Sequence, residues 1–286
     1  MFIKRDAFST ELSTGIPQKR NVFFIFVHFG DPKVTDAAIA SAIREGQRAD
    51  RIIVVDHGGA PYKTAHAVSV VRTKTNKGYA AGLREGMLHV GSLKPSSYDI
   101  VVLANNDVVL EKGARRRIIA WWEKNGSNRT LAGASWGYVS LLSGRSHVAR
   151  NIARRPSWSI PYIHGSCIVM EYGFAQNIAW PTELYMYWED VVFSMAAVQN
   201  GASLRVISGL PVAHDDAVAS PSPQKAYYLV RNGAYVLERL ASWPWRAYWF
   251  FINSLRWAYH RILPKHRHIA QALGDARLQR LGKMSV

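Results

Sequence analysis

The strongest constraint on the fold is a series of near-continuous apolar runs in the first third of the chain. These runs occupy residues 21–29, 51–59, 67–73 and 98–107, and segments with helical spacing lie between them at 34–46 and 78–90. A run without polar alternation predicts a strand buried on both faces, as in a parallel sheet. Strands that are joined through helices make right-handed crossovers. The pattern therefore predicts an α/β protein with a mainly parallel sheet.

Polar residues stand where these predicted strands end. Asp56 follows the apolar run of the second strand, and Asn105-Asn106-Asp107 closes the last one. In open parallel sheets, ligands bind beyond the carboxyl ends of the strands. A carboxylate there can bind a hard divalent cation, which makes Asp107 a candidate metal ligand, although an ordinary Asn/Asp turn is the alternative. Asp56 also has two interpretations: its carboxylate can accept hydrogen bonds from a nucleotide, or it can simply end the strand.

Two adjacent acids, Glu189 and Asp190, follow the aromatic stretch "ELYMYW" (183–188) and precede a segment with helical character. One interpretation is structural, because acids in the first turn of a helix offset the positive end of its dipole. The other is chemical, because a carboxylate beside aromatic groups is a candidate proton acceptor. The residues alone leave both interpretations open.

The chain carries a large positive charge, with 36 basic and 20 acidic residues among 286 and a formal net charge of +16. Such an excess indicates an anionic partner, which can be nucleic acid, anionic lipid or a phosphorylated substrate. The single cysteine, Cys167, excludes an intramolecular disulfide and is expected in the core. No apolar stretch reaches the roughly 18 residues of a membrane span, and the first 20 residues lack the apolar centre of a signal peptide.

The C-terminal segment, 241–286, differs in composition from the rest. It holds eight Lys/Arg against one acid, together with four of the ten tryptophans. Helical spacing over 244–263 places Trp249, Leu255 and Ile262 on an apolar face and Asn253 and Arg256 on a polar one. The segment can lie on an anionic bilayer, pack on the preceding domain or form an oligomer contact. We favour the bilayer, because aromatic and basic residues are concentrated together.

The order of the motifs narrows the possibilities. An Asp after the second strand, "NKGYAAG" (76–82), "NND" (105–107), "GSC" (165–167), "WED" (188–190) and a lone histidine before "YYLVRN" (227–232) follow one another. This series resembles family 2 glycosyltransferases with the GT-A fold, and among them the bacterial rhamnosyltransferase-like members. The resemblance covers roughly residues 21–240. It implies a lead-in at 1–20, a Rossmann-like GT-A catalytic domain at 21–240 and an amphipathic helical extension at 241–286.

The resemblance also implies roles on the donor side of the site. Asp107 and His214 would bind Mg²⁺ or Mn²⁺ on the diphosphate of a nucleotide sugar. The nucleotide itself would be bordered by Asp56, Asn76, Gly78, Asn106 and Arg231. Three positions depart from the family pattern, since His57-Gly58-Gly59 follows Asp56, Leu83-Arg84 replaces paired asparagines, and Asn105 replaces the first acid of a DxD motif.

On the acceptor side, the resemblance implies that Asp190 is the general base, with Glu189 as its catalytic neighbour. Tyr187 and Trp188 would contact the acceptor. The implied reaction is inverting transfer of a sugar, with rhamnose from dTDP-rhamnose as the best match, to a hydroxyl of a surface polysaccharide or lipid-linked glycan. The expected location is cytoplasmic and peripheral at the inner face of the membrane.

Alternatives remain from the sequence. The donor can be a UDP-sugar, with a hexosyl or galactofuranosyl group transferred. Proteins of another class are a basic nucleic-acid-binding protein or a non-catalytic protein that binds sugar nucleotides. The expected strands lack the interleaved aromatic and basic residues of an RNA-binding sheet, so a nucleic-acid partner is not expected.

Overall fold

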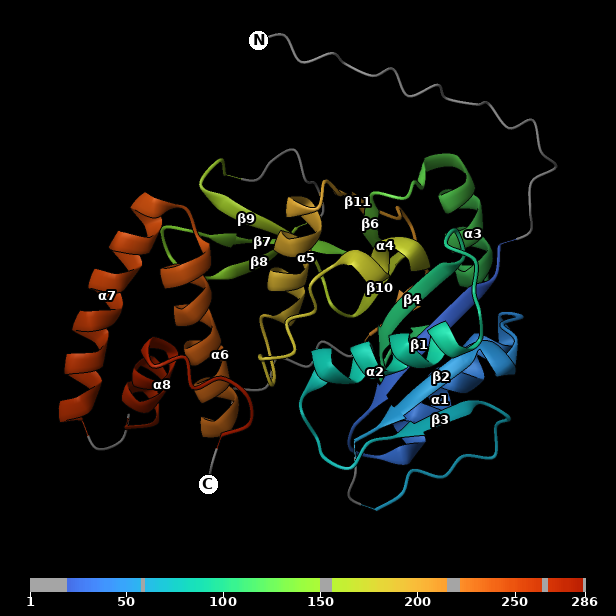
Figure 1. Ribbon diagram of the computed structural model, residues 1–286, viewed down its shortest axis with the longest axis horizontal. Coiled ribbons are helices and arrows are strands. Elements are labelled where there is room, and N and C mark those ends of the chain that lie inside the picture. Colours follow the sequence, from blue (N-terminus) through green and yellow to red (C-terminus); the bar gives the residue numbers. More distant parts are fainter. Residues whose placement is uncertain (1–19, 58–59, 150–155, 215–221, 264–266, 285–286) are drawn as a thin grey trace, which may run out of the picture.

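The computed structural model describes residues 20–57, 60–149, 156–214, 222–263 and 267–284. Of the predicted lead-in, only Arg20 is among them, and most of the Arg-rich connection at 145–155 lies outside the described residues. Within these ranges the elements form a sheet-based body and a group of C-terminal helices at one end (Figure 1).

The largest sheet of the described residues has seven strands in the order β11-β6-β10-β4-β1-β2-β3 (Figure 1). These strands are β1 (Val22–His28), β2 (Ile52–Asp56), β3 (Ser69–Arg72), β4 (Ile100–Asn105), β6 (Thr130–Gly133), β10 (Cys167–Glu171) and β11 (Ser203–Val206). All neighbours pair in parallel except β10, which runs antiparallel between β4 and β6. The predicted mainly parallel sheet is confirmed.

The register of the three central strands sets the position of the site. His28 at the end of β1 pairs with Asp56 at the end of β2, and Val27 pairs with Asn105 at the end of β4. The carboxyl ends of these strands are therefore level along one edge. Their preceding residues are almost fully buried, as their uninterrupted apolar runs predicted.

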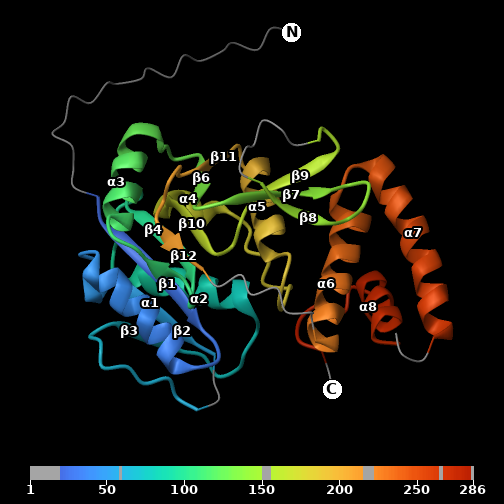
Figure 2. The same ribbon diagram turned by 180° about the vertical axis from the view of Figure 1, so that it is seen from behind.

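Helices cover both faces of this sheet. The two views in Figures 1 and 2 show α1 (Pro32–Arg44) and α2 (Tyr79–Ser92) on opposite faces. The body also contains α3 (Ala114–Asn125), α4 (Tyr172–Asn177), α5 (Glu189–Gln199) and a short 3₁₀ turn (Ala49–Arg51). The helix α2 matters most for the site, because its first turn lies where the central strands end.

Two small sheets complete the body. β5 (Val109–Leu110) pairs with β12 (Val212–Ala213), and β7 (Trp136–Ser140) lies between β8 (Ser146–Ala149) and β9 (Ser159–Ile163). The sequence predicted one strand near 162–173, and the structure instead has the end of β9, all of β10 and the start of α4 there. A Gly-Ser turn at 165–166 makes the break.

The C-terminal helices form a bundle of α6 (Pro223–Tyr235), a π-helical turn (Val236–Leu240), α7 (Trp243–Ile262) and α8 (Arg267–Arg277). The helix α6, from the predicted catalytic domain, shares a buried cluster with α8, from the predicted extension. Trp249 of α7 donates from Nε1 to the carbonyl oxygen of Leu141 at 2.7 Å, which joins the bundle to the turn between β7 and β8. In the part of the chain that the structure describes, no helix is long and apolar enough to cross a membrane.

Candidate active site

A cavity of about 330 Å³ opens at the carboxyl ends of β1 and β4, where the first turn of α2 also begins. Its wall includes six residues that the sequence predicted for the site: Asn76, Gly78, Asn106, Asp107, Tyr187 and Glu189. These residues come from three separate segments of the chain. The structure therefore brings the predicted donor side and the predicted acceptor side into one cavity.

Gly78 lets the backbone close this cavity. Its φ is 102°, a conformation that side-chain-bearing residues rarely adopt, and a Cβ atom there would lie 2.3 Å from the carbonyl oxygen of Tyr185. The amide of Gly78 is held by the Asn76 side chain at 2.9 Å. Asn76 and Gly78 thus bring the start of α2 against the segment that carries the acid pair.

Asp56 lies in an adjoining hollow of about 750 Å³, which shares His28, His57 and Asn76 with the cavity or its rim. Its carboxylate is 2% exposed, accepts the backbone N–H of Tyr62 at 3.0 Å and forms an ion pair with Arg72. The Tyr62 ring stacks on His28 with 4.4 Å between ring centroids. Asp56 therefore organises the wall of this hollow through its own protein partners.

Asp107 and His214 meet although they are far apart in sequence. Asp107 lies two residues before β5, and His214 directly follows β12. The antiparallel pairing of these two strands therefore places His214 beside Asp107. His214 Nε2 lies 3.3 Å from Asp107 Oδ1 and 3.2 Å from Asn105 Nδ2. The hydrogen bond from His214 lowers the pKa of Asp107, so this carboxylate is ionised at neutral pH.

This pair fits a divalent cation whose remaining ligands come from a substrate. Asp107 Oδ1 is buried from solvent, and an ionised carboxylate with an imidazole is a donor set for Mg²⁺ or Mn²⁺. Within the described ranges, no group of three or more His, Cys, Asp or Glu side chains could hold a metal. A cation at this place would therefore need oxygen atoms from a bound diphosphate.

The acid pair is presented by an unusual piece of backbone. Tyr187 and Trp188 have φ values of 65° and 71°, the left-handed region that is unfavourable for such bulky residues, and α5 begins directly after them. The side chain of Asn232 in α6 holds this segment by donating to the carbonyl oxygens of Met186 and Tyr187, at 2.7 and 2.9 Å. α6 thus fixes the direction in which α5 starts.

The two acids differ in their surroundings. Asp190 accepts the N–H groups of Gly165 at 3.0 Å and of Val191 at 2.8 Å, whereas Glu189 Oε2 is buried without a hydrogen-bond partner among the described residues. Burial, together with the charge of Asp190, raises the pKa of Glu189 to about 8. Burial also raises the pKa of Asp190, but His164 and the two N–H groups oppose that rise. At neutral pH Glu189 therefore keeps its proton, and the two N–H groups that Asp190 accepts favour the ionised form of that carboxylate.

Three residues of this site were not predicted. Tyr79, the first residue of α2, has a buried hydroxyl without a hydrogen-bond partner among the described residues and lines the cavity next to Glu189. His164 acts on the charge of Asp190, and its ring lies 6.1 Å from that of His214. Asn232 holds the loop. Tyr79 and Asn232 stood within the quoted motifs "NKGYAAG" and "YYLVRN", but without these roles, and His164 carried no sequence signal.

Five predicted site residues do not line this cavity. Asp56 lies in the adjoining hollow, His214 contacts Asp107, and Asp190 lines a small separate hollow of about 20 Å³ with Glu189, Tyr79 and Gly165.

The other two of these residues are Arg231 and Trp188. Arg231 is 1% exposed, donates from Nη1 to the carbonyl oxygen of Gly282 at 2.7 Å and has its guanidinium 4.9 Å from the ring centroid of Tyr228. Its described contacts are thus to other residues of α6, among them Asn232, and to the C-terminal segment. Trp188 lines a separate hollow of about 460 Å³ with residues of α6 and α7, and its indole N–H donates to Leu229. Cys167 is buried in β10, as predicted, and burial raises the pKa of its thiol to about 12.

Comparison with known proteins identifies the fold. No protein-family model matches the chain, and no curated protein matches it. Among solved structures, a mannosyltransferase, PcManGT from Pyrobaculum calidifontis in complex with GDP-Man and Mn²⁺, is similar with a TM-score of 0.50 and 10% identity over 92% of this chain and 88% of that one. TarS from S. aureus gives a TM-score of 0.47 and 15% identity over 82% of this chain and 43% of its own. The chain has the predicted GT-A fold with a C-terminal helical extension.

Proposed function

We propose that the protein is a glycosyltransferase that moves a sugar from a nucleotide donor to an acceptor hydroxyl. The observation that carries the proposal is the shared cavity, in which the ionised Asp107, paired with His214, faces Glu189 from the acid pair. Transfer from a nucleotide sugar needs positive charge at the leaving diphosphate and a general base beside the hydroxyl that receives the sugar. The similarity in fold to a structure that contains GDP-Man and Mn²⁺ supports the same assignment.

On the donor side, Asp107 and His214 would hold Mg²⁺ or Mn²⁺, which when bound offsets the charge of the departing diphosphate. Asn76, Gly78 and Asn106 border the same cavity and would contact the nucleotide sugar. Asp56 would act on the nucleotide from the adjoining hollow, where the stacked rings of His28 and Tyr62 offer a surface for a base. We propose dTDP-rhamnose as donor, on the resemblance in sequence, with a UDP-sugar as the alternative.

The proposed reaction uses the two acids differently. Asp190 accepts the proton of the acceptor hydroxyl while the acceptor oxygen bonds to the anomeric carbon. The bond from that carbon to the diphosphate breaks on the opposite side and the diphosphate leaves with the electron pair, so the configuration inverts. Glu189, which holds a proton at neutral pH, donates a hydrogen bond to the bound substrate. The buried setting of both acids helps to keep water from hydrolysing the donor.

The acceptor side includes Tyr187 in the cavity and Trp188 in the neighbouring hollow. We propose that the acceptor is a surface polysaccharide or lipid-linked glycan, whose sugar rings would contact these aromatic side chains. The corresponding location is cytoplasmic and peripheral at the inner face of the membrane.

A binding screen tests the proposal. Thermal unfolding would be followed with dTDP-rhamnose, UDP-galactofuranose and GDP-mannose, each with Mn²⁺ and with a chelator. One nucleotide sugar is expected to stabilise the protein, by about 2.7 kcal/mol at a hundred times its Kd. Asp107→Asn should abolish this effect, and Asp50→Asn, at an exposed position paired with Arg48, should preserve it. Stabilisation by none of the three would contradict the assignment, and equal stabilisation with the chelator would contradict the metal role alone.

A further inference from the structure

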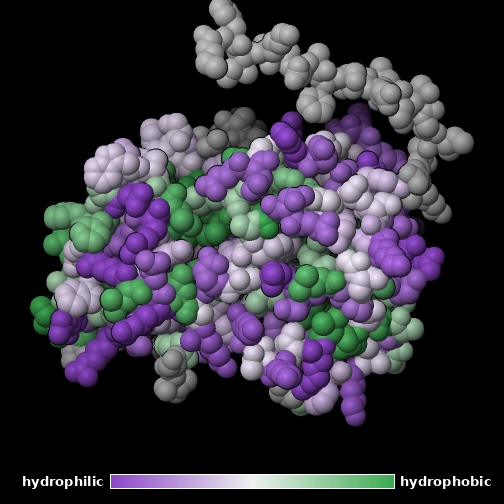
Figure 3. All heavy atoms as spheres, viewed as in Figure 1, coloured by the Kyte–Doolittle hydropathy of each residue, from purple (hydrophilic) through white to green (hydrophobic). Residues whose placement is uncertain are grey.

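The helix α7 turns large apolar side chains to the outside of the molecule. Figures 1 and 2 place it as the outermost element at this end of the molecule, and Figure 3 shows hydrophobic residues at the surface over the same region. The exposed side chains are Trp243, Phe250, Phe251, Leu255, Tyr259 and Ile262, each at least 55% exposed. Positions 251, 255 and 262 recur at helical spacing, so they form one continuous stripe.

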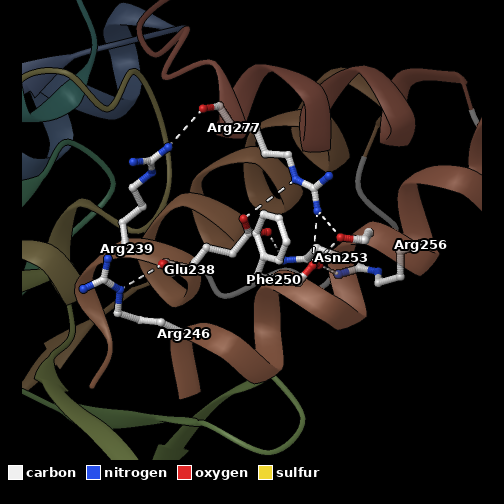
Figure 4. A network of polar contacts seen from close by, with 8 residues as sticks. Glu238, Arg239, Arg246, Phe250, Asn253, Arg256 and Arg277 are labelled. Atoms are coloured by element: carbon white, nitrogen blue, oxygen red, sulfur yellow. Dashed lines mark hydrogen bonds and ion pairs between the residues drawn. The ribbon is translucent and has the colours of Figure 1, made fainter. Parts of the chain in front are cut away.

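The polar side of the same helix faces inward. Asn253 is 1% exposed and donates to Glu238 at 2.8 Å, and Arg256 donates to Asn253 at 2.9 Å (Figure 4). Arg277 of α8 reaches into this network and donates to Ser254 and to the carbonyl oxygen of Phe250. Apolar residues of α7 such as Trp249 and Ile252 also pack inward, so the helix carries apolar side chains on both sides. An ordinary surface helix keeps its outer face polar.

This arrangement corrects the face that the sequence predicted. The spacing placed Trp249, Leu255 and Ile262 together on one apolar side. In the structure Trp249 packs inward against the turn between β7 and β8, while Leu255 and Ile262 point outward at 55% and 80% exposure. Asn253 is buried and Arg256 is partly buried on the same side as Trp249, although the sequence placed both on the polar face of the helix.

The charges around α7 favour an anionic surface. Residues 222–284 contain two acids, and both are engaged within the bundle: Glu238 with Asn253 and Arg277, and Asp275 with Tyr227 and Arg280. Arg261 is exposed on α7 at the edge of the apolar stripe, whereas Arg246 lies on the opposite side of the helix and donates to the carbonyl oxygen of Glu238 (Figure 4). The outward surface therefore combines apolar side chains with a flanking cation, and neither of the two acids is a free counter-charge there.

The apolar side chains and the charges together decide which kind of partner fits the outward face of α7. A second copy of the chain would bring two surfaces of a protein with net charge +16 together, which repulsion opposes. Nucleic acid would satisfy the flanking cation but leave the apolar stripe without a partner. An anionic bilayer satisfies both, since aliphatic side chains and phenylalanines enter the acyl boundary, Trp and Tyr lie at headgroup level, and arginines contact phosphates.

We propose that the outward face of α7 binds the surface of a bilayer that contains anionic lipid, with the helix axis parallel to the membrane. Phe251, Leu255 and Ile262 enter the boundary between headgroups and acyl chains, and Arg261 contacts lipid phosphate. This inference does not depend on the proposed transferase activity, because it rests on the C-terminal bundle alone.

Vesicle sedimentation tests the inference with the full chain. Vesicles of phosphatidylcholine alone would be compared with an equimolar mixture of phosphatidylcholine and phosphatidylglycerol, at low and high salt. The protein should sediment with the mixed vesicles, and high salt should weaken the binding by screening its electrostatic part. The variant Phe251→Ser/Leu255→Ser/Ile262→Ser should bind at least about tenfold more weakly, because three side chains no longer enter the acyl boundary.

A matched control removes exposed apolar side chains elsewhere. Leu88→Ser/Leu93→Ser/Val148→Ser, at positions that are 42–67% exposed, should bind vesicles like the wild type. Unchanged thermal unfolding would show that both variants remain folded. Wild-type protein that binds neither vesicle, or an α7 variant that binds as well as the control, would overturn the inference. A dimer that the α7 variant abolishes, without vesicle binding, would assign the face to a second copy instead.

Discussion

The loop that presents the acid pair should depend on one buried side chain, Asn232. Its amide donates to the carbonyl oxygens of Met186 and Tyr187, and its own oxygen accepts from Nε of Arg231 at 2.9 Å. The left-handed backbone at Tyr187 and Trp188 costs of order 1–3 kcal/mol for each residue and needs such external support. Asn232 is fully buried, so water cannot replace these bonds.

The substitution Asn232→Leu keeps a similar volume and removes all three hydrogen bonds. Each net hydrogen bond contributes about 1 kcal/mol, and carbonyl and guanidinium groups left unpaired in a buried place add a desolvation penalty. The free energy of unfolding should therefore fall by about 3–5 kcal/mol. The control Asn177→Leu removes one exposed bond to the carbonyl oxygen of Gly173 and should cost within about 0.5 kcal/mol.

Urea unfolding followed by circular dichroism measures the stability loss, and transfer assays at a temperature where both variants are folded measure its effect on function. Displacement of α5 by about 1 Å should reduce kcat by about 10²-fold, because the acids lose their alignment with the acceptor. Donor affinity should stay unchanged, since Asp107 and His214 lie on other elements. If Asn232→Leu unfolds at the same urea concentration as Asn177→Leu, Asn232 does not hold the loop.

Three further substitutions test separate parts of the account. Gly78→Ala should lower the free energy of unfolding by about 3 kcal/mol in urea, because its Cβ would meet Tyr185, whereas Gly46→Ala, with a φ of 80° and no atom within 4 Å, should cost about 1 kcal/mol. Glu189 has a pKa of about 8 when folded against 4.5 as an ordinary value, so the folded state keeps a proton that the unfolded state has released. The stability of the wild type should therefore fall relative to Glu189→Gln as pH rises from 4.5 to about 8, and a constant difference across that range would refute the burial of this acid. Arg231→Met should lower the free energy of unfolding by about 2–3 kcal/mol without changing the donor affinity measured in a binding titration. Weaker donor binding would instead support the phosphate contact that the sequence predicted for Arg231.

The central strands could be predicted because their runs leave little choice. β1, β2 and β4 are apolar up to their last residue, and a strand buried on both faces accommodates such a run. β6, β7 and β8 were not identified, since they are four or five residues long and are interrupted by Gly and Ser. Short strands of this kind are set by their partners across the sheet rather than by their own pattern.

The site, like the fold, has parts that the sequence could predict and parts that it could not. Asn76, Gly78 and Asp107 stand at the ends of predicted elements, so the topology alone sends them to one edge. Asn232 supports Tyr187 although the two residues are 45 positions apart, so no local sequence pattern predicts this hydrogen bond. The orientation of α7 was equally inaccessible, because periodicity defines a stripe without saying whether core or exterior receives it.

The central claim concerns the acid pair, and the most direct measurement is the rate of sugar transfer by Asp190→Asn with the donor that the binding screen identifies. Loss of a general base should lower transfer by at least about 10²-fold while the donor still binds with wild-type affinity. Glu189→Gln serves as the companion variant, since its amide keeps the hydrogen-bond donor, and it should retain much more activity. Transfer by Asp190→Asn at the wild-type rate would contradict the assignment of Asp190 as the base.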